Sequence, residues 1–120
     1  MHVRSYADLG EFVTLDGSEI REWAGALSMP ALNQSLAEAT IAVEQSTTAH
    51  YHRTIEELYL VVEGLGRLVV DGEEREIAEG DCALIAPGAT HKLYNIGGRP
   101  LRVICACAPP YSDADTVLVD

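Results

Sequence analysis

The 120-residue sequence contains no run of apolar residues long enough to cross a membrane. A membrane helix needs roughly 18 or more such residues in a row. The N-terminus also lacks the basic leader and short apolar segment that mark a secretory signal. We therefore expect a soluble, unprocessed protein that resides in the cytoplasm.

Positive charge is scarce. Eight Lys and Arg residues stand against 19 Asp and Glu residues, which gives a formal net charge of −11. Nucleic acids and anionic membranes bind surfaces rich in Lys and Arg, so this balance argues against both as partners. The excess negative charge more plausibly serves solubility.

Cysteine is rare and occurs in an odd number, which argues against a disulfide framework. The three cysteines are Cys82, Cys105 and Cys107. Cys105 and Cys107 would share a face of a strand and could act as soft metal ligands, but no second Cys pair or nearby His accompanies them. Because free cysteine is usually buried as a small apolar group, we expect all three to pack in the core.

What the sequence does contain is a series of short alternating or apolar segments separated by turn residues. Asp71-Gly72 gives the clearest hairpin signal, since a type I′ turn needs positive φ at both central positions. The segment 58–62 is apolar at every position, which is typical of a strand in a sheet covered on both faces. Strands are predicted at 20–23, 36–43, 58–62, 67–70, 73–77, 82–86, 91–95 and 101–108.

This pattern, without a convincing amphipathic helix, predicts an antiparallel sandwich or barrel. A chain of this length is one domain with a core of its own. We expect residues 1–35 to form an N-terminal arm or outer strands, 36–108 the barrel, and 109–120 a segment at its rim. Trp23, the single tryptophan, is interpreted as a core or dimer-interface anchor, with a wall of the ligand pocket as the alternative.

Histidines supply the strongest chemical signal. Alternate residues of a strand point to the same face, so His50 and His52 lie on one face about 6.6 Å apart along the chain. Imidazoles at that spacing can close on one metal ion, because zinc–nitrogen bonds are about 2.0–2.1 Å. Glu57 would face the other way on a straight strand, so the chain must turn around residues 53–56 if this carboxylate is to join them.

These residues resemble the two motifs of the cupin superfamily. The sequence departs from the motifs at Glu44, where a Gly is usual, and at Ala86, where a Pro is usual. Neither is a ligand position. The first motif matches His50, His52, Glu57 and Gly64, and the second matches Gly80, Gly88, His91 and Asn95.

The resemblance implies an all-β fold, an antiparallel β-barrel or sandwich of the double-stranded β-helix type, that is usually a homodimer. It implies one divalent metal ion held by His50, His52, Glu57 and His91. Three imidazoles and one carboxylate suit Fe, Mn, Ni, Zn or Co, and cellular availability would decide among them.

Fewer residues are candidates for a role beside the metal. Tyr59 shares a strand face with Glu57 and is the candidate catalytic residue, with an aromatic core residue as the equal alternative. Asn95 is expected to stabilise the turn after His91, and Tyr51 to point away from the metal. Arg53 is interpreted as a solvated rim residue that could instead bind an anion, and Tyr111 as a cap on the pocket.

Three functions fit these features. The first is a metal-dependent enzyme acting on a small organic molecule, with a preference for dioxygenase-type chemistry because four protein ligands leave two octahedral positions open. The second is a non-catalytic cupin that binds metal or a small molecule. The third is a metal-dependent isomerase, epimerase or lyase. A sugar epimerase would need basic residues for a phosphate or nucleotide group. The chain has only eight Lys and Arg residues, and Arg53, Lys92 and Arg102 are taken as the nearest to the site in sequence.

Overall fold

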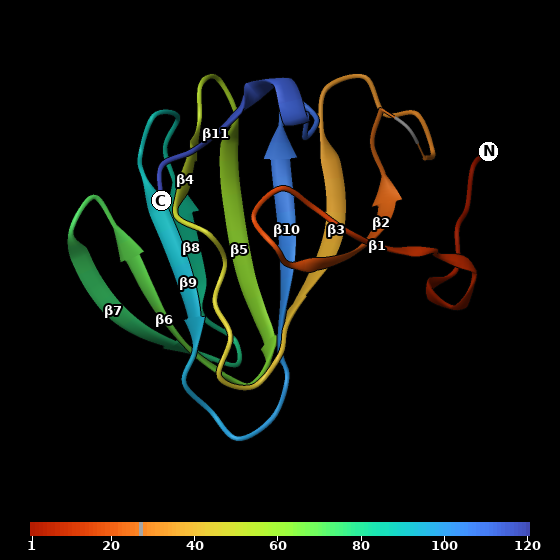
Figure 1. Ribbon diagram of the computed structural model, residues 1–120. Helices are drawn as coiled ribbons and strands as arrows, with labels where there is room; N and C mark the ends of the chain where they lie inside the picture. The colour runs from red at the N-terminus through yellow and green to blue at the C-terminus, as the bar shows by residue number, and fades with distance from the viewer. Residues whose placement is uncertain (27) are drawn as a thin grey trace.

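The computed structural model describes residues 1–26 and 28–120, which form two antiparallel sheets that face each other as a sandwich (Figure 1). The six-stranded sheet has the order β1-β2-β3-β10-β5-β8, and the five-stranded sheet has the order β11-β4-β9-β6-β7. This confirms the predicted fold class. The elements are η1 (Tyr6–Asp8), β1 (Glu11–Val13), β2 (Glu19–Ala24), β3 (Ser35–Ile41), β4 (His50–His52), β5 (Glu56–Glu63), β6 (Leu65–Val70), β7 (Glu73–Ala78), β8 (Cys82–Ile85), β9 (His91–Asn95), β10 (Leu101–Ala108), η2 (Asp113–Asp115) and β11 (Thr116–Leu118).

The chain changes sheets between the two halves of the first motif. Strand β4 belongs to the five-stranded sheet and β5 to the six-stranded sheet, with bends at residues 53 and 54 between them. The predicted turn before Glu57 is therefore confirmed. Because the sheets face each other, the inner faces of β4 and β5 point into the same interior. On one straight strand, His52 and Glu57 would point to opposite faces and could not meet.

Left-handed backbone occurs at the turns that the sequence indicated. Asp71 and Gly72 have φ values of 48° and 84°, as the predicted hairpin requires. Glu44, where the cupin motif usually has Gly, has φ of 65°. The usual Gly adopts such a φ without the steric cost that a side chain incurs, so this chain keeps the same turn with a less suitable residue.

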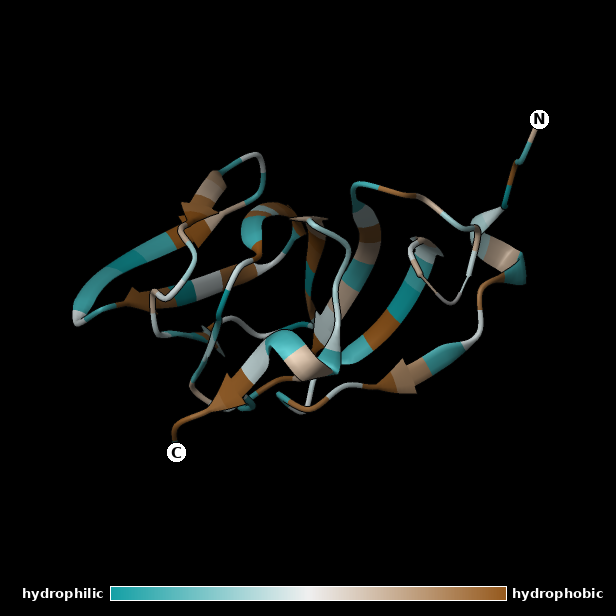
Figure 2. Cartoon of the chain, turned by 90° about the horizontal axis from the view of Figure 1, so that it is seen from above, coloured by the Kyte–Doolittle hydropathy of each residue, from teal (hydrophilic) through white to brown (hydrophobic). Residues whose placement is uncertain are grey.

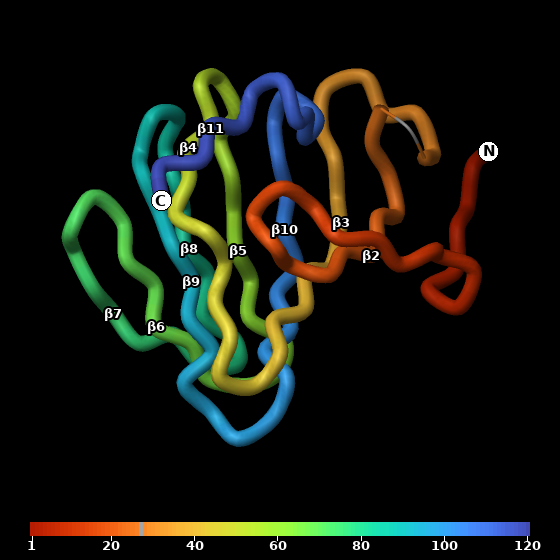
Figure 3. Tube along the Cα trace, in the orientation of Figure 1, coloured from red at the N-terminus to blue at the C-terminus, as the bar shows by residue number. Residues whose placement is uncertain are grey.

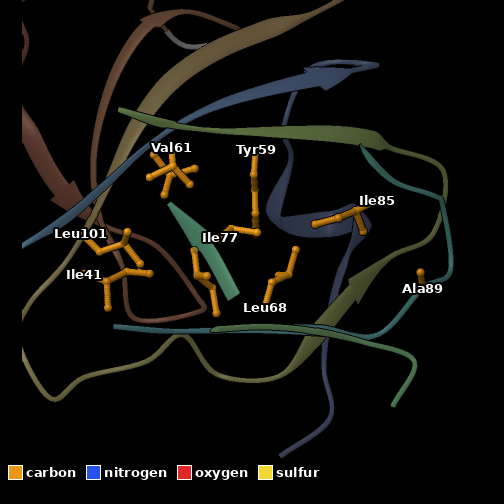
Figure 4. Close-up of a cluster of buried hydrophobic side chains, with 10 residues drawn as sticks. Ile41, Tyr59, Val61, Leu68, Ile77, Ile85, Ala89 and Leu101 are labelled. Carbon is orange, nitrogen blue, oxygen red and sulfur yellow. The ribbon is translucent and has the colours of Figure 1, made fainter. Parts of the chain in front are cut away.

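The core lies between the sheets and is built largely from alternate residues of each strand. Tyr59 and Val61 of β5 point inward toward Leu68 and Ile77 from the opposite sheet (Figure 4). The prediction that segment 58–62 is covered on both faces is wrong for the described chain. The other face of this segment lies on the outer surface of the sheet, where Leu58 is 41% exposed, Leu60 39% and Val62 41%.

Those three side chains belong to an apolar outer face of the six-stranded sheet. Leu58 lies opposite Leu84 of β8, which is 63% exposed. Cys82 is also exposed there, so the prediction of core packing is wrong for this cysteine, whose strand β8 is the sheet edge. The expected homodimer stays a prediction.

The N-terminal segment extends the six-stranded sheet. Strands β1 and β2 form a hairpin, and β2 pairs with β3; in the view of Figure 3 this hairpin crosses in front of β10. The buried carboxylate of Glu38 ties the segment down, because it accepts hydrogen bonds from Tyr6 Oη at 2.7 Å and from Arg102 Nη2 at 2.6 Å. Trp23 packs beside Tyr6, with ring centroids 5.8 Å apart.

The C-terminal segment forms one edge of the five-stranded sheet. Strand β11 pairs with β4 in the register Thr116 to His52, so part of the predicted rim segment is a strand of the five-stranded sheet. The carboxylate of Asp115 accepts hydrogen bonds from the backbone N–H groups of Thr54 and Ile55 at 3.0 to 3.1 Å. These contacts hold the bend between β4 and β5 in place.

One edge of the five-stranded sheet is polar. Strand β7 forms one edge of the five-stranded sheet and is largely hydrophilic, as predicted for segment 73–77 (Figure 2). Charged side chains on an edge strand discourage pairing with other chains. Among residues 1–26 and 28–120, no helix has the length and apolar character needed to span a membrane.

Gly64 of the first motif is expected to be intolerant of a side chain. Its φ is 95°, and an added Cβ would lie 3.0 Å from the Pro100 carbonyl oxygen and 3.1 Å from the Leu101 Cα. We expect Gly64→Ala to lower the free energy of unfolding by about 1–3 kcal/mol, measured by urea denaturation. Gly98→Ala is the control, since an added Cβ there meets no atom within 4 Å. Equal effects of the two substitutions would contradict the prediction.

Candidate metal centre

Four buried side chains converge between the sheets: His50 and His52 from β4, Glu57 from β5 and His91 from β9. One potential ligand atom from each lies within 4.8 Å of the other three. Glu57 Oε1 is 3.4 Å from the Nε2 atoms of both His52 and His91. The cross-strand pairing of His50 with His91 fixes which imidazoles meet.

Hydrogen bonds at the other ring nitrogen orient each imidazole. The Nδ1 atoms of His50 and His91 donate to backbone carbonyls, Thr48 at 2.7 Å and Ala89 at 2.9 Å. His52 Nδ1 lies 3.0 Å from Thr116 Oγ1, and because that hydroxyl donates to the Ser112 carbonyl, it accepts from His52. A neutral imidazole with its proton on Nδ1 turns the lone pair of Nε2 inward.

Glu57 remains ionised in spite of its burial. Burial by itself raises its pKa, but the imidazoles of His52 and His91, whose Nε2 atoms lie 3.4 Å from Oε1, outweigh burial and lower the pKa from 4.5 to about 2. The second oxygen, Oε2, accepts a hydrogen bond from the Cys107 thiol at 3.2 Å. Burial raises the pKa of Cys107, so the thiol keeps its proton and remains a donor.

The inward atoms fit a divalent cation. His52 Nε2, His91 Nε2 and Glu57 Oε1 are buried without any hydrogen-bond partner. Such groups are costly unless something satisfies them. Neighbouring ligands of an ion with bonds of about 2.1 Å lie roughly 3.0–3.4 Å apart, which agrees with the two 3.4 Å separations. The residues present could therefore hold a metal through these atoms.

A cavity opens onto this cluster. The space in it that a water-sized molecule can reach is about 60 Å³, and His50, His52 and Glu57 lie in its wall. Tyr59 and Tyr111 also line it, and the ring of Tyr111 stands edge-on to that of His52 with centroids 5.9 Å apart. Most of the remaining wall is apolar, formed by residues such as Ile20, Ala37, Ala39, Ile41 and Val103.

The other residues singled out in the sequence lie in or beside the site as follows. Asn95 accepts from the Gly97 N–H and donates to the Arg99 carbonyl, so it stabilises the turn after β9 as predicted. Arg53 is exposed and lies outside the cavity wall, in agreement with a rim residue, and Trp23 is likewise outside it. Cys107 is buried as expected, and Cys105 also lines the cavity; neither belongs to the metal cluster.

Two polar residues at the site escaped the sequence analysis. Thr116 accepts the hydrogen bond from His52 Nδ1, and Asp16, predicted only as part of a turn, has Oδ2 3.7 Å from His50 Nε2. Both belong to segments outside the two motifs. A turn signal at Asp16-Gly17 was visible in the sequence, but no local pattern indicates which strand that turn will contact.

The hydroxyl of Thr116 is expected to tune the metal affinity through His52. Thr116→Val keeps the β-branched shape but leaves His52 Nδ1 without its acceptor. Losing such a partner of a ligand typically weakens metal binding about 10- to 100-fold, and we expect that loss in competition titrations with a chelator dye. Thr54→Val, at an exposed threonine of the neighbouring bend, is the control. An affinity equal to that of wild type would show that the hydrogen bond does not matter.

Acid is expected to destabilise the protein. Burial, followed by the charge of His91, lowers the pKa of His50 below 6.5. The unfolded chain therefore binds more protons than the folded chain, and the free energy of unfolding falls as pH falls through 6.5. Glu57 acts in the same direction, losing its contribution as pH falls from 4.5 toward 2. Urea midpoints of chelator-treated protein between about pH 7.5 and 5 should therefore decrease with pH; an increase would contradict the prediction.

The fold and the cluster together define the class of protein: a small antiparallel β-sandwich whose interior holds one candidate metal centre of three imidazoles and a carboxylate. The family model for the cupin domain matches residues 37–107, which include all four candidate ligands, and the chain belongs to this family. A relative from Methanocaldococcus jannaschii, the uncharacterized protein MJ1618, is 40% identical over 115 residues, covering 96% of this chain and 92% of the relative.

Solved structures with similar folds include two enzymes. Pac13, a nucleoside dehydratase from Streptomyces, superposes with a TM-score of 0.81 at 13% identity, covering 99% of this chain and 91% of Pac13. The oxalate decarboxylase of Lactobacillus farciminis superposes with a TM-score of 0.81 at 21% identity, covering 94% of this chain but only 34% of the decarboxylase. These similarities establish the double-stranded β-helix fold.

Proposed function

We propose that the protein is a metal-dependent enzyme acting on a small organic molecule bound in the cavity beside His50, His52, Glu57 and His91. The observation that carries this proposal is the set of unpartnered inward atoms, two imidazole nitrogens and a carboxylate oxygen, next to a largely apolar cavity. A divalent ion held there would supply Lewis acidity and two open octahedral positions. A purely structural site would have no need of a cavity leading to it.

The side chains around the cluster have separate tasks in this proposal. Cys107 and Thr116 hold Glu57 and His52 in position. Tyr111 covers His52 at the mouth and keeps water away from it. Burial, together with Glu57, raises the pKa of Tyr59 well above its ordinary value, so its hydroxyl stays protonated and can donate a hydrogen bond to a bound molecule. We therefore propose Tyr59 as the catalytic residue, acting as a hydrogen-bond donor to the bound molecule.

Dioxygenase-type chemistry is the first reaction to test, because an iron ion held by His50, His52, Glu57 and His91 would supply oxygen-activating chemistry next to the cavity. The experiment measures oxygen uptake by Fe(II)-loaded protein with a panel of catechols, thiols and diketones. Uptake that requires both metal and substrate supports the proposal, and Tyr59→Phe should lower the rate while metal content stays constant. A protein that holds iron but turns over none of the panel would remove the dioxygenase branch.

The identity of the native metal needs a separate measurement. Elemental analysis of protein purified without chelator or nickel resin should find one of Fe, Mn, Ni, Zn or Co at close to one ion per chain. Metal-free protein that also fails to bind these ions on titration would overturn the proposed enzyme.

A further inference from the structure

The carboxylate of Asp16 is held in one orientation at the tip of the β1–β2 hairpin. Its Oδ1 atom accepts three hydrogen bonds: from Thr14 Oγ1 at 2.8 Å, from the Ser18 N–H at 2.9 Å and from Ser18 Oγ at 2.6 Å. Asp16 lines the cavity, and its Oδ2 atom lies 3.7 Å from His50 Nε2. One oxygen is therefore used to fix the side chain, and the other is presented toward the candidate ligands.

The hairpin itself is tied to the segment that precedes His50. The Thr48 N–H donates a hydrogen bond to the Asp16 carbonyl oxygen at 2.7 Å, and Thr48 in turn accepts from His50 Nδ1. Backbone and side chain of Asp16 are thus both attached, and the Asp16 side chain is only 14% exposed. Oδ2 is preorganised beside the cluster, which favours a role in recognition over a chance surface contact.

Cationic side chains near the motifs are engaged elsewhere. Of the described residues that line the cavity, none is Lys or Arg. The three basic residues singled out in the sequence contact other parts of the surface. Arg53 donates to the Ala114 carbonyl, Lys92 pairs with Asp120, and Arg102 pairs with Glu38.

Carboxylates, in contrast, line the cavity at three places: Asp16, Glu22 and Glu57. A divalent cation with Asp16 and Glu57 beside it sums to no net formal charge. A carboxylate or phosphate entering the cavity would then face Asp16 and Glu22, with no Lys or Arg among the described residues of the cavity wall, and like charges repel. A neutral or cationic group carrying N–H or O–H would instead find an acceptor in Asp16 Oδ2.

Given the metal site proposed above, we propose that Asp16 selects the substrate. Its Oδ2 accepts a hydrogen bond from an amine or hydroxyl group placed next to the metal, the body of the molecule packs on the apolar wall, and anionic groups are disfavoured. The substrate class is therefore a neutral or cationic amine, alcohol or phenol with an apolar body. Dicarboxylates and sugar phosphates fall outside this class.

The test compares two probes that differ only in the group beside the metal. 2-Aminomethylpyridine and pyridine-2-carboxylate have the same ring and form the same five-membered chelate, but one offers N–H donors and the other a carboxylate. Their affinities for Co²⁺-loaded protein are measured from the visible spectrum, with wild type, Asp16→Asn and Glu76→Gln. Asparagine keeps the Oδ1 acceptor and replaces only Oδ2, and Glu76 is an exposed carboxylate on β7 that serves as a control for net charge.

We expect Asp16→Asn to weaken aminomethylpyridine binding roughly 10- to 100-fold, the effect of losing a hydrogen bond to a charged acceptor. Pyridine-2-carboxylate should bind more tightly to the same variant, and Glu76→Gln should match wild type for both probes. Metal content and melting temperature are measured alongside. If the ratio of the two affinities in Asp16→Asn equals that of wild type, the selection by Asp16 is overturned and the proposed enzyme is not.

Two further outcomes separate this inference from the proposed function. A loss of Co²⁺ from Asp16→Asn as large as that from His52→Ala would make Asp16 a metal ligand and overturn its role in selection. Failure of wild type to bind Co²⁺ would overturn the proposed enzyme, and the selection by Asp16 with it.

Discussion

Replacing His52 with Ala should remove most of the metal from the protein. His52 is buried, its Nε2 faces Glu57 at 3.4 Å without a hydrogen-bond partner, and no neighbouring imidazole within the described cluster could take its place. Losing a ligand lowers the metal affinity more than losing the hydrogen-bond partner of a ligand, which costs about 10- to 100-fold in affinity. We therefore expect an affinity decrease of at least about 100-fold in a chelator competition assay, and near absence of metal after dialysis.

The matched control is Tyr51→Ala, on the same short strand. Tyr51 lies between the two histidines and so projects to the opposite face of β4, outside the cluster. Its variant should keep close to wild-type metal content even if it is less stable. Thermal melting adds a second readout: an ion present at about 100 times its Kd stabilises wild type by about 2.7 kcal/mol, and His52→Ala should lack this increase. Equal metal loss in both variants would contradict the assignment of strand faces.

The strands could be predicted because their signals are local: period-two alternation and turn residues such as Asp71-Gly72 each occupy only a few neighbouring residues. The four candidate ligands could be predicted because their spacing resembles the two cupin motifs. The turn after His52 followed from parity alone, since Glu57 could not otherwise reach the histidines. The structure bears out that reasoning by assigning β4 and β5 to different sheets.

The features that escaped prediction depend on contacts distant in sequence. Thr116 meets His52 across 64 positions, through the pairing of β11 with β4. Asp16 reaches His50 only because the β1–β2 hairpin folds back over the cavity. The local sequence pattern predicts neither the register of β11 on β4 nor the direction in which the β1–β2 hairpin folds. The exposed Leu60 shows the converse: an apolar residue in a strand indicates a sheet surface, but not whether the same chain covers it.

Glu57→Gln should remove the gain in stability that a bound metal gives, which the loss of a residue with only a structural role would not do. In the metal-free protein the ionised carboxylate is almost fully buried, with Oε1 facing the Nε2 atoms of His52 and His91. The pKa of Glu57 is lowered to about 2, so its charge already favours the folded metal-free chain, and glutamine removes that contribution. We expect chelator-treated Glu57→Gln to unfold at a lower urea concentration than wild type.

The metal-loaded comparison should widen that difference. A divalent cation beside three neutral imidazoles depends on Glu57 for its only protein charge in the cluster, and removing one partner of a buried charge pair costs about 3–5 kcal/mol, or roughly 10²- to 10³-fold or more in affinity. Glu57→Gln should therefore gain little stability from added Zn²⁺ or Co²⁺, whereas wild type gains the full effect. Glu56→Gln, at the exposed neighbouring carboxylate, should follow wild type in both states. If Glu57→Gln is destabilised without metal and binds metal normally, the carboxylate supports the fold and is not a ligand.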